Sequence, residues 1–263
     1  MNDASIGILD SGSGGLSIWK EISSILPCES IMYLGDHGYM PYSNKTTKYI
    51  RDRVCHIIQF LSDKKAKLIV VACNTATVAG VEFYRKKFPR VPIVGVVPVI
   101  KTATQISRKQ RIAVLSTKYT AQSIYQKKFI QQFAMGCEVK VIGSTRLVSL
   151  IEKGNLVSCG IGRELQRLLS SIAEENIDVL VLGCTHYPFV RDQIRAIVGE
   201  SMVILDSGGA VARQVKRILE HNNALANGEG GMYTFFTTGE SKQVGRIASA
   251  LLHREILMNY VIL

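Results

Sequence analysis

Short apolar runs alternate with longer amphipathic segments from one end of the 263-residue chain to the other. The apolar runs have the length of buried strands, and the segments between them place apolar residues at helical spacing. This alternation favours parallel sheets with helices on both faces, so the predicted fold class is α/β. Strands are expected at Ser5–Leu9, Ser30–Leu34, Lys67–Ala72, Val91–Val96, Arg111–Leu115, Glu138–Ile142, Asp178–Gly183, Met202–Leu205 and Met232–Thr237. Helices are expected in segments such as Lys48–Phe60, Ala121–Phe133, Leu165–Ile172 and Ala210–Leu219.

Two cysteines stand at the ends of two of these strands. Cys73 follows the apolar run 68–72, and Cys184 follows the run 179–183. In open α/β sheets, ligands bind just beyond the carboxyl ends of the strands, so each thiol is expected at a ligand-binding position. Two thiols in matching contexts suggest a pair that faces one ligand. The six cysteines are too widely spaced for a C-x-x-C redox or zinc motif, so we expect free thiols and no metal site.

The formal net charge of +11 raises the question of a polyanionic partner. The basic residues are spread over the chain, and their local clusters fall at predicted helix ends, where they complement the helix dipole. A nucleic-acid partner is left open, but no motif supports one. No apolar run approaches the about 20 residues of a membrane-spanning helix, and the first residues lack the features of a secretory signal. We therefore expect no membrane association and a cytoplasmic location.

The turn 10–16 after the first strand is rich in glycine and leads into a helix. It is not a dinucleotide-binding G-x-G-x-x-G motif, because Ser17 stands where the last glycine is required. Two interpretations stay open. The backbone amides of the turn could bind a carboxylate or another small anion. Alternatively, Asp10 or Ser11 could simply cap the helix that follows.

Hydrogen-bonding side chains follow each of the two thiols. Asn74 and Thr75 come after Cys73, whereas Thr185 and His186 come after Cys184. Each thiol is also expected beside a helix N-terminus, which lowers thiol pKa values and favours an anionic ligand. His186 is a candidate proton partner for Cys184, and a core or solvated histidine is the alternative.

Taken together, these motifs resemble the glutamate racemases of the aspartate/glutamate racemase superfamily. The motifs that carry the resemblance are Asp10-Ser-Gly-x-Gly-Gly, Pro41-Tyr42, Ala72-Cys73-Asn74-Thr75 and Gly183-Cys184-Thr185-His186-Tyr187-Pro188. They occur in the family's order over nearly the whole chain. The resemblance implies cofactor-independent racemisation of glutamate, in which one cysteine removes the Cα proton and the other delivers a proton to the opposite face. It implies neither a metal nor pyridoxal phosphate, and D-glutamate would serve peptidoglycan synthesis.

The resemblance also assigns roles to individual residues. The catalytic set would be Cys73 assisted by Asp10, Cys184 assisted by His186, and Glu152 as a further acidic residue. The substrate would be bound by Asp10, Ser11, Pro41, Tyr42, Ser43, Asn74, Thr75, Thr117, Thr120 and Thr185. Ser43 and Ser116 stand where the family usually has glycine. The departure at Ser43 leaves the preference for the substrate's side chain open.

For the architecture, the resemblance implies two α/β lobes with mainly parallel sheets flanked by helices and the active site in the cleft between them. Residues 1–95 and 208–263 would form the first lobe, which carries Cys73, and residues 96–207 the second, which carries Cys184. A homodimer is expected. The apolar segment 256–263 either packs on the first lobe or forms an interface. Two other functions stay open: a racemase or isomerase of aspartate or another small acid, and a regulatory role of the basic surface on nucleic acid.

Overall fold

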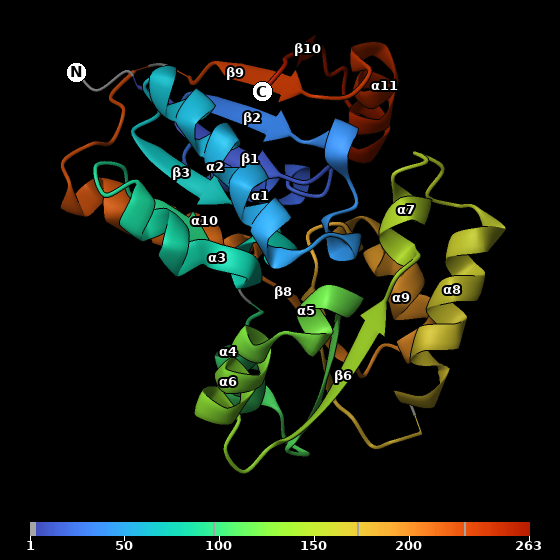
Figure 1. The fold of residues 1–263 in the computed structure, drawn as a ribbon. Helices are drawn as coiled ribbons and strands as arrows, with labels where there is room; N and C mark the ends of the chain where they lie inside the picture. Colours follow the sequence, from blue (N-terminus) through green and yellow to red (C-terminus); the bar gives the residue numbers. More distant parts are fainter. Residues whose placement is uncertain (1–3, 97, 173, 229) are drawn as a thin grey trace.

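Two parallel sheets form the frame of the computed structural model, which describes residues 4–96, 98–172, 174–228 and 230–263 (Figure 1). The larger sheet has the strand order β10-β9-β2-β1-β3-β4, and the smaller has the order β6-β5-β7-β8. The larger contains β1 (Ile6–Asp10), β2 (Ile31–Gly35), β3 (Leu68–Val71), β4 (Ile93–Gly95), β9 (Tyr233–Thr237) and β10 (Met258–Tyr260). The smaller contains β5 (Arg111–Thr117), β6 (Glu138–Ser144), β7 (Val179–Gly183) and β8 (Val203–Asp206). The predicted α/β class with parallel sheets is confirmed.

Helices cover both faces of the six-stranded sheet because its strands are apolar on both sides. Ile6 and Ile8 of β1 belong to one core with α1 (Leu16–Ile25), α10 (Gly208–His221) and α11 (Ser241–Leu252). Leu9, the next residue of the strand, packs on the other face. There it meets α2 (Thr47–Asp63) and α3 (Asn74–Lys87).

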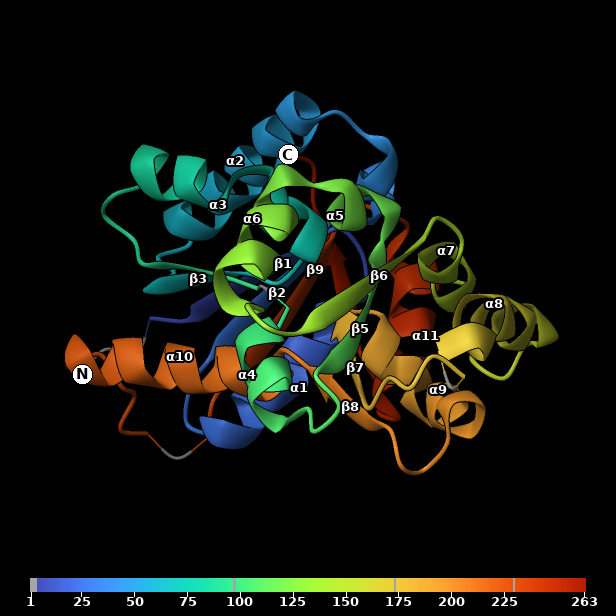
Figure 2. The same ribbon diagram turned by 90° about the horizontal axis from the view of Figure 1, so that it is seen from below.

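The four-stranded sheet repeats this arrangement. Leu180 and Leu182 of β7 pack with α7 (Leu147–Ile151), α8 (Cys159–Leu169) and α9 (Arg191–Val198). On the opposite face, Val179 and Val181 pack with α4 (Ile100–Ile106), and α6 (Ile124–Phe133) completes that layer. Figure 2 shows α4 and α6 on one side of this sheet and α8 and α9 on the other. The shorter helices are α5 (Lys118–Gln122) and the 3₁₀ turns η1 (His37–Tyr39), η2 (Tyr42–Asn44), η3 (Ser170–Ile172) and η4 (Tyr187–Val190).

Each of the nine predicted strands overlaps an observed one, and two differences have physical causes. The predicted helix Ala121–Phe133 is divided at Ser123, whose extended backbone ends α5. Its hydroxyl accepts a hydrogen bond from Gln126 N at 3.1 Å and so caps α6. The C-terminal apolar segment supplies β10, which lies at the sheet edge with Met258 opposite Phe235. Within the described residues, no helix combines the length and the apolar character needed to cross a bilayer.

A buried ion pair fixes the loop that follows β2. Asp36 is fully buried and accepts hydrogen bonds from Arg53 of α2, at 2.7 Å to Oδ1 and 3.2 Å to Oδ2. Tyr42 donates to Oδ2 at 2.6 Å, and Thr238 donates to Oδ1 at 2.9 Å. Because every one of these donors comes from a different segment, the pair holds the loop 36–44 against α2 and the end of β9.

We expect Arg53→Leu to lower the free energy of unfolding by about 3–5 kcal/mol, because it leaves the Asp36 carboxylate buried without its counter-charge. Equilibrium urea denaturation measures this change. Lys48→Ala is the matched control on the same helix, since it breaks the exposed ion pair with Asp52 and should leave the urea midpoint unchanged. Equal effects of the two variants would contradict the structural role given to Arg53.

Candidate active site

The carboxyl ends of two strand pairs bring the predicted site residues together. In the six-stranded sheet, Leu9 lies opposite Val71, so the turn after β1 and Cys73 after β3 leave the sheet side by side. In the four-stranded sheet, Ser116 lies opposite Gly183, so the end of β5 and Cys184 are likewise neighbours.

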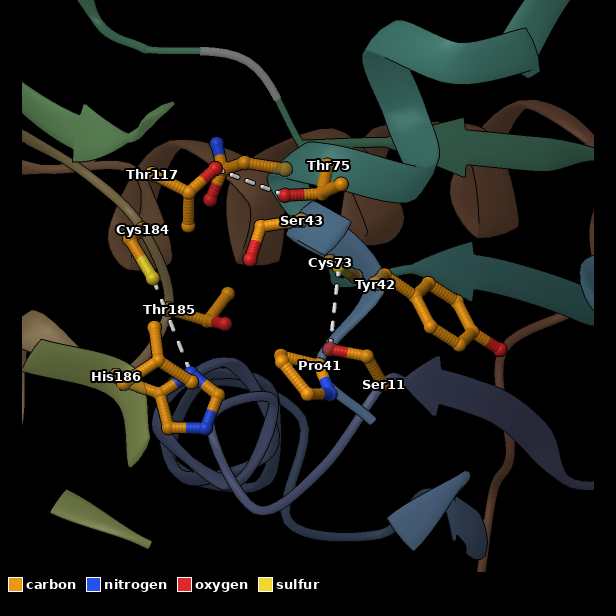
Figure 3. A pocket seen from close by; sticks show the side chains of 12 residues that line it. Ser11, Pro41, Tyr42, Ser43, Cys73, Thr75, Thr117, Cys184, Thr185 and His186 are labelled. Carbon is orange, nitrogen blue, oxygen red and sulfur yellow. Dashed lines mark hydrogen bonds between the residues drawn. The ribbon is translucent and has the colours of Figure 1, made fainter. Parts of the chain in front are cut away.

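A pocket lies between these two edges (Figure 3). It is lined by Ser11, Pro41, Tyr42, Ser43, Cys73, Asn74, Thr75, Thr117, Val148, Cys184, Thr185 and His186. The other three predicted residues lie behind this lining: Asp10 bonded to Thr185, Thr120 bonded to Thr117, and Glu152 bonded to His186. Val148 of α7 is the lining residue that the sequence analysis missed, since an apolar residue on the inner face of a helix carries no motif.

Cys73 is the N-cap of α3, as its position before a helix suggests. Its sulfur accepts a hydrogen bond from Ala76 N and donates one to Ser11 Oγ, both at 3.5 Å. The side chain is 5 % exposed. Burial, with a further contribution from the charge of Asp10, raises the pKa of Cys73 to about 12. The thiol is therefore protonated at neutral pH.

Asp10 lies within the glycine-rich turn and does not cap the following helix. The N-cap of α1 is Gly15, and no side chain caps it, so the interpretation of Asp10 or Ser11 as a helix cap is wrong. Instead, Asp10 Oδ1 accepts a hydrogen bond from Gly12 N at 2.9 Å, and Oδ2 accepts one from Thr185 Oγ1 at 3.1 Å. Burial raises the pKa of Asp10 to about 6, although the charge of His186 acts in the other direction.

Cys184 belongs to a buried chain of polar groups. Its sulfur lies 3.8 Å from His186 Nδ1, and His186 Nε2 lies 2.7 Å from Glu152 Oε1. Burial alone would lower the pKa of His186, but the contact with Cys184 and the Glu152 carboxylate raise it well above its usual range. Burial would raise the pKa of Glu152, but the hydrogen bond and charge of His186 lower it to about 2. The pair is therefore an imidazolium beside a carboxylate, and the imidazolium can stabilise a thiolate on Cys184.

The predicted α-helix N-terminus beside Cys184 is not found. The 3₁₀ turn η4 follows the cysteine, and α9 begins only at Arg191. Pro188 lies at the start of η4, where its ring supplies no N–H group for an anion. The positive charge beside this thiol therefore comes from His186 rather than from a helix dipole.

Three threonines link the two sheets at the pocket, two of them in its lining and Thr120 behind it. Thr75 Oγ1 lies 3.0 Å from Thr117 Oγ1 and 3.4 Å from Thr120 Oγ1, and Thr117 donates to Thr120 at 3.0 Å. On the other side, the ring of Tyr42 is turned away from the pocket, whereas the Ser43 hydroxyl is turned toward it (Figure 3). Tyr42 thus acts through its bond to Asp36, which holds the loop.

Comparisons with known proteins agree with this arrangement. A family model described as Asp/Glu/Hydantoin racemase matches residues 24–215. A glutamate racemase from Pseudomonas putida is 39 % identical over 251 residues, which cover 95 % of both chains. The chain belongs to the glutamate racemase family. The crystal structure of a glutamate racemase isoform from Bacillus anthracis superposes with a TM-score of 0.91 at 32 % identity and covers 100 % of this chain and 99 % of that one.

A glutamate racemase from Francisella tularensis, solved in complex with D-glutamate, has a TM-score of 0.87 at 27 % identity, with coverage of 100 % and 98 %. As a member of the glutamate racemase family, the protein is an amino-acid racemase, an enzyme of the isomerase class. The family resemblance inferred from the cysteine motifs is confirmed.

The two thiols differ in their charged neighbours but hardly in exposure, which is 5 % for Cys73 and 6 % for Cys184. We expect iodoacetamide at pH 7 to modify Cys184 faster than Cys73, because the thiolate is the reactive form. Mass spectrometry of the cysteine peptides over time measures both rates. His186→Asn should remove the preference, and faster modification of Cys73 in the unchanged protein would contradict this account of the site.

Proposed function

We propose that the protein interconverts L-glutamate and D-glutamate without a cofactor, by passing the α proton between Cys73 and Cys184. The observation that carries the proposal is the pair of buried thiols that reach one pocket from the ends of β3 and β7. The choice of glutamate is supported by the curated relatives and by the relative that binds D-glutamate. The D-glutamate formed would supply peptidoglycan synthesis.

The reaction balances with the two thiols alone. One cysteine, as a thiolate, takes the proton from Cα, and the electron pair of that C–H bond spreads into the α-carboxylate. The other cysteine, as a thiol, then gives its proton to the opposite face of Cα. One thiol and one thiolate remain at the end, with their places exchanged. The His186 imidazolium lies beside Cys184 and can stabilise a thiolate there, whereas burial keeps Cys73 as the thiol.

Each cysteine needs its own proton partner to return to the starting form. Asp10, with its pKa of about 6, is suited to take a proton from Cys73 when that cysteine must act as the base. His186, held by Glu152, stabilises the thiolate of Cys184. The two partners come from different sheets, because Asp10 ends β1 and His186 follows β7.

The transition state places negative charge on the α-carboxylate. Neutral hydrogen-bond donors of the pocket would stabilise this charge. No lysine or arginine is among the twelve lining residues. Asn74 and Thr75 offer amide and hydroxyl groups that the surrounding hydrogen bonds already orient. Donors that are oriented before the reaction stabilise developing charge without reorganising during it.

The proposal is tested by incubating the protein with L-glutamate in D₂O while circular dichroism and α-proton NMR signals are followed. We expect loss of optical activity together with deuterium at Cα. Cys73→Ser and Cys184→Ser should each slow racemisation at least about a hundredfold, because a hydroxyl is a far weaker acid and base than a thiol. Cys159→Ser, at an exposed position on α8, is the matched control and should retain the full rate.

Racemisation of L-aspartate in place of L-glutamate would move the proposal to another small acid. Exchange with neither amino acid would refute it. Undiminished turnover by either active-site variant would refute the two-thiol mechanism while leaving the substrate assignment in place.

The Asp10 carboxyl predicts the acid side of the pH profile. Below pH 6 this group is protonated and cannot accept a proton from Cys73, so kcat/KM should rise with pH through about 6. Steady-state rates between pH 5 and 8 measure the rise. Asp10→Asn should lower kcat and remove this dependence, and a variant that keeps the same inflection would show that another group causes it.

A further inference from the structure

The chain of polar groups that begins at Cys184 does not end at Glu152. Ser13, in the glycine-rich turn, contacts both oxygens of that carboxylate. Its backbone N–H donates to Oε1 at 2.5 Å, and its hydroxyl lies 3.0 Å from Oε2. The same hydroxyl lies 2.9 Å from Nε2 of His37, a second histidine located at the end of β2. A continuous path therefore joins His37 to the Cys184 thiol through Ser13, Glu152 and His186.

The other ring nitrogen of His37 determines what this path can do. Nδ1 lies 3.0 Å from the carbonyl oxygen of Gly35, which can only accept a hydrogen bond, so Nδ1 carries a proton. Thr237 Oγ1, at 2.9 Å, is a second neighbour of the same nitrogen. In neutral His37, Nε2 is consequently an acceptor, and in charged His37 it is a donor.

The Ser13 hydroxyl has one proton, which it can donate either to His37 Nε2 or to Glu152 Oε2. When His37 is neutral, the hydroxyl can donate to His37 Nε2, and Glu152 Oε2 then loses a donor. When His37 is charged, Nε2 donates to the hydroxyl, whose own proton is then directed to Glu152 Oε2. A carboxylate that accepts an additional hydrogen bond stabilises a neighbouring imidazolium less strongly.

We propose that His37 and Ser13 are positioning residues that set, through the Ser13 hydroxyl, how strongly Glu152 holds the His186 imidazolium beside Cys184. The proposal rests on the proposed function for its consequence in catalysis, because His186 acts on Cys184 there. Neither His37 nor Ser13 lines the pocket. Both therefore act through Glu152 and not on the substrate.

Burial and the groups that face His37 determine the direction in which its pKa is shifted. Burial lowers its pKa, and the Glu152 carboxylate opposes this effect. His186 also faces the ring and lowers the pKa, whereas Asp36, which is paired with Arg53, raises it. His37 is thus neutral at neutral pH and becomes charged on the acid side, so the Ser13 hydroxyl turns from His37 to Glu152 as the pH falls.

The test is an NMR titration of the five histidine rings in the full chain, labelled with ¹⁵N and assigned by single His→Gln variants. In the unchanged protein, we expect the ring nitrogens of His186 to show an inflection at the pH at which His37 itself titrates. In Ser13→Ala, His37 should still titrate but the inflection at His186 should shrink, because only the direct charge interaction between the two rings remains. Ser24→Ala, at an exposed position of α1, the helix that follows this turn, is the matched control and should keep the inflection at its full size.

The proposal would be overturned if the His186 signals of the unchanged protein showed no inflection where His37 titrates. It would also be overturned if Ser13→Ala showed an inflection of the same size. Because this measurement needs no turnover, it gives an answer even if the protein does not racemise glutamate. Conversely, racemisation without the coupled inflection would leave the proposed function standing and remove the role of His37.

Kinetics provide the second measurement. Ser13→Ala and His37→Gln should lower kcat about three- to thirtyfold, the range of couplings through a neighbouring residue, and change KM less than twofold. A residue with a merely structural role would not alter the pH profile of kcat. Here the acid side of that profile should change shape in both variants, and profiles that keep the unchanged shape would contradict the proposal.

Discussion

The close approach of the turn after β1 to the segments around Glu152 and Cys184 is the constraint on which the site depends. A Cβ atom at Gly12 would collide with the Glu152 carboxylate, and one at Gly14 would lie 2.5 Å from Thr185 Oγ1. Glycine at these two positions therefore lets the two sheets meet with their strand ends together. The hydrogen bonds of Asp10 with Thr185 and of Ser13 with Glu152 then join the two edges.

Two chemically identical thiols become different because this junction gives them different neighbours. Burial, and then the nearby Asp10 carboxyl group, make the ionised form of Cys73 costly. Cys184 lies beside an imidazolium that a second carboxylate holds in place. The carboxyl group beside Cys73 ends the neighbouring strand β1, whereas the imidazolium beside Cys184 comes from two residues along the chain and its carboxylate from the end of α7.

The sequence predicted what depends on burial and missed what depends on individual contacts. Parallel strands that are buried on both faces produce apolar runs, and these located nine strands, whereas β10 is a short edge strand whose Tyr260 is exposed. The thiols were found because each ends such a run. His37 and Ser13 were not identified from the sequence, because their role depends on a contact between two separate loops that no sequence pattern indicates. The division into lobes at residues 95 and 207 and the homodimer stay predictions.

Unequal thiols raise the question of whether the site favours one product. The two enantiomers of an amino acid have equal free energies, so the equilibrium constant of a racemase is one whatever surrounds its acids and bases. The kcat/KM values of the two directions must then be equal. A difference between Cys73 and Cys184 can make kcat and KM differ between the two directions. Both constants must then differ by the same factor, so that kcat/KM stays equal. In the proposed two-thiol mechanism, the contrast between the Asp10 and His186 environments therefore sets which enantiomer the enzyme is ready to deprotonate, and it leaves the final composition unchanged.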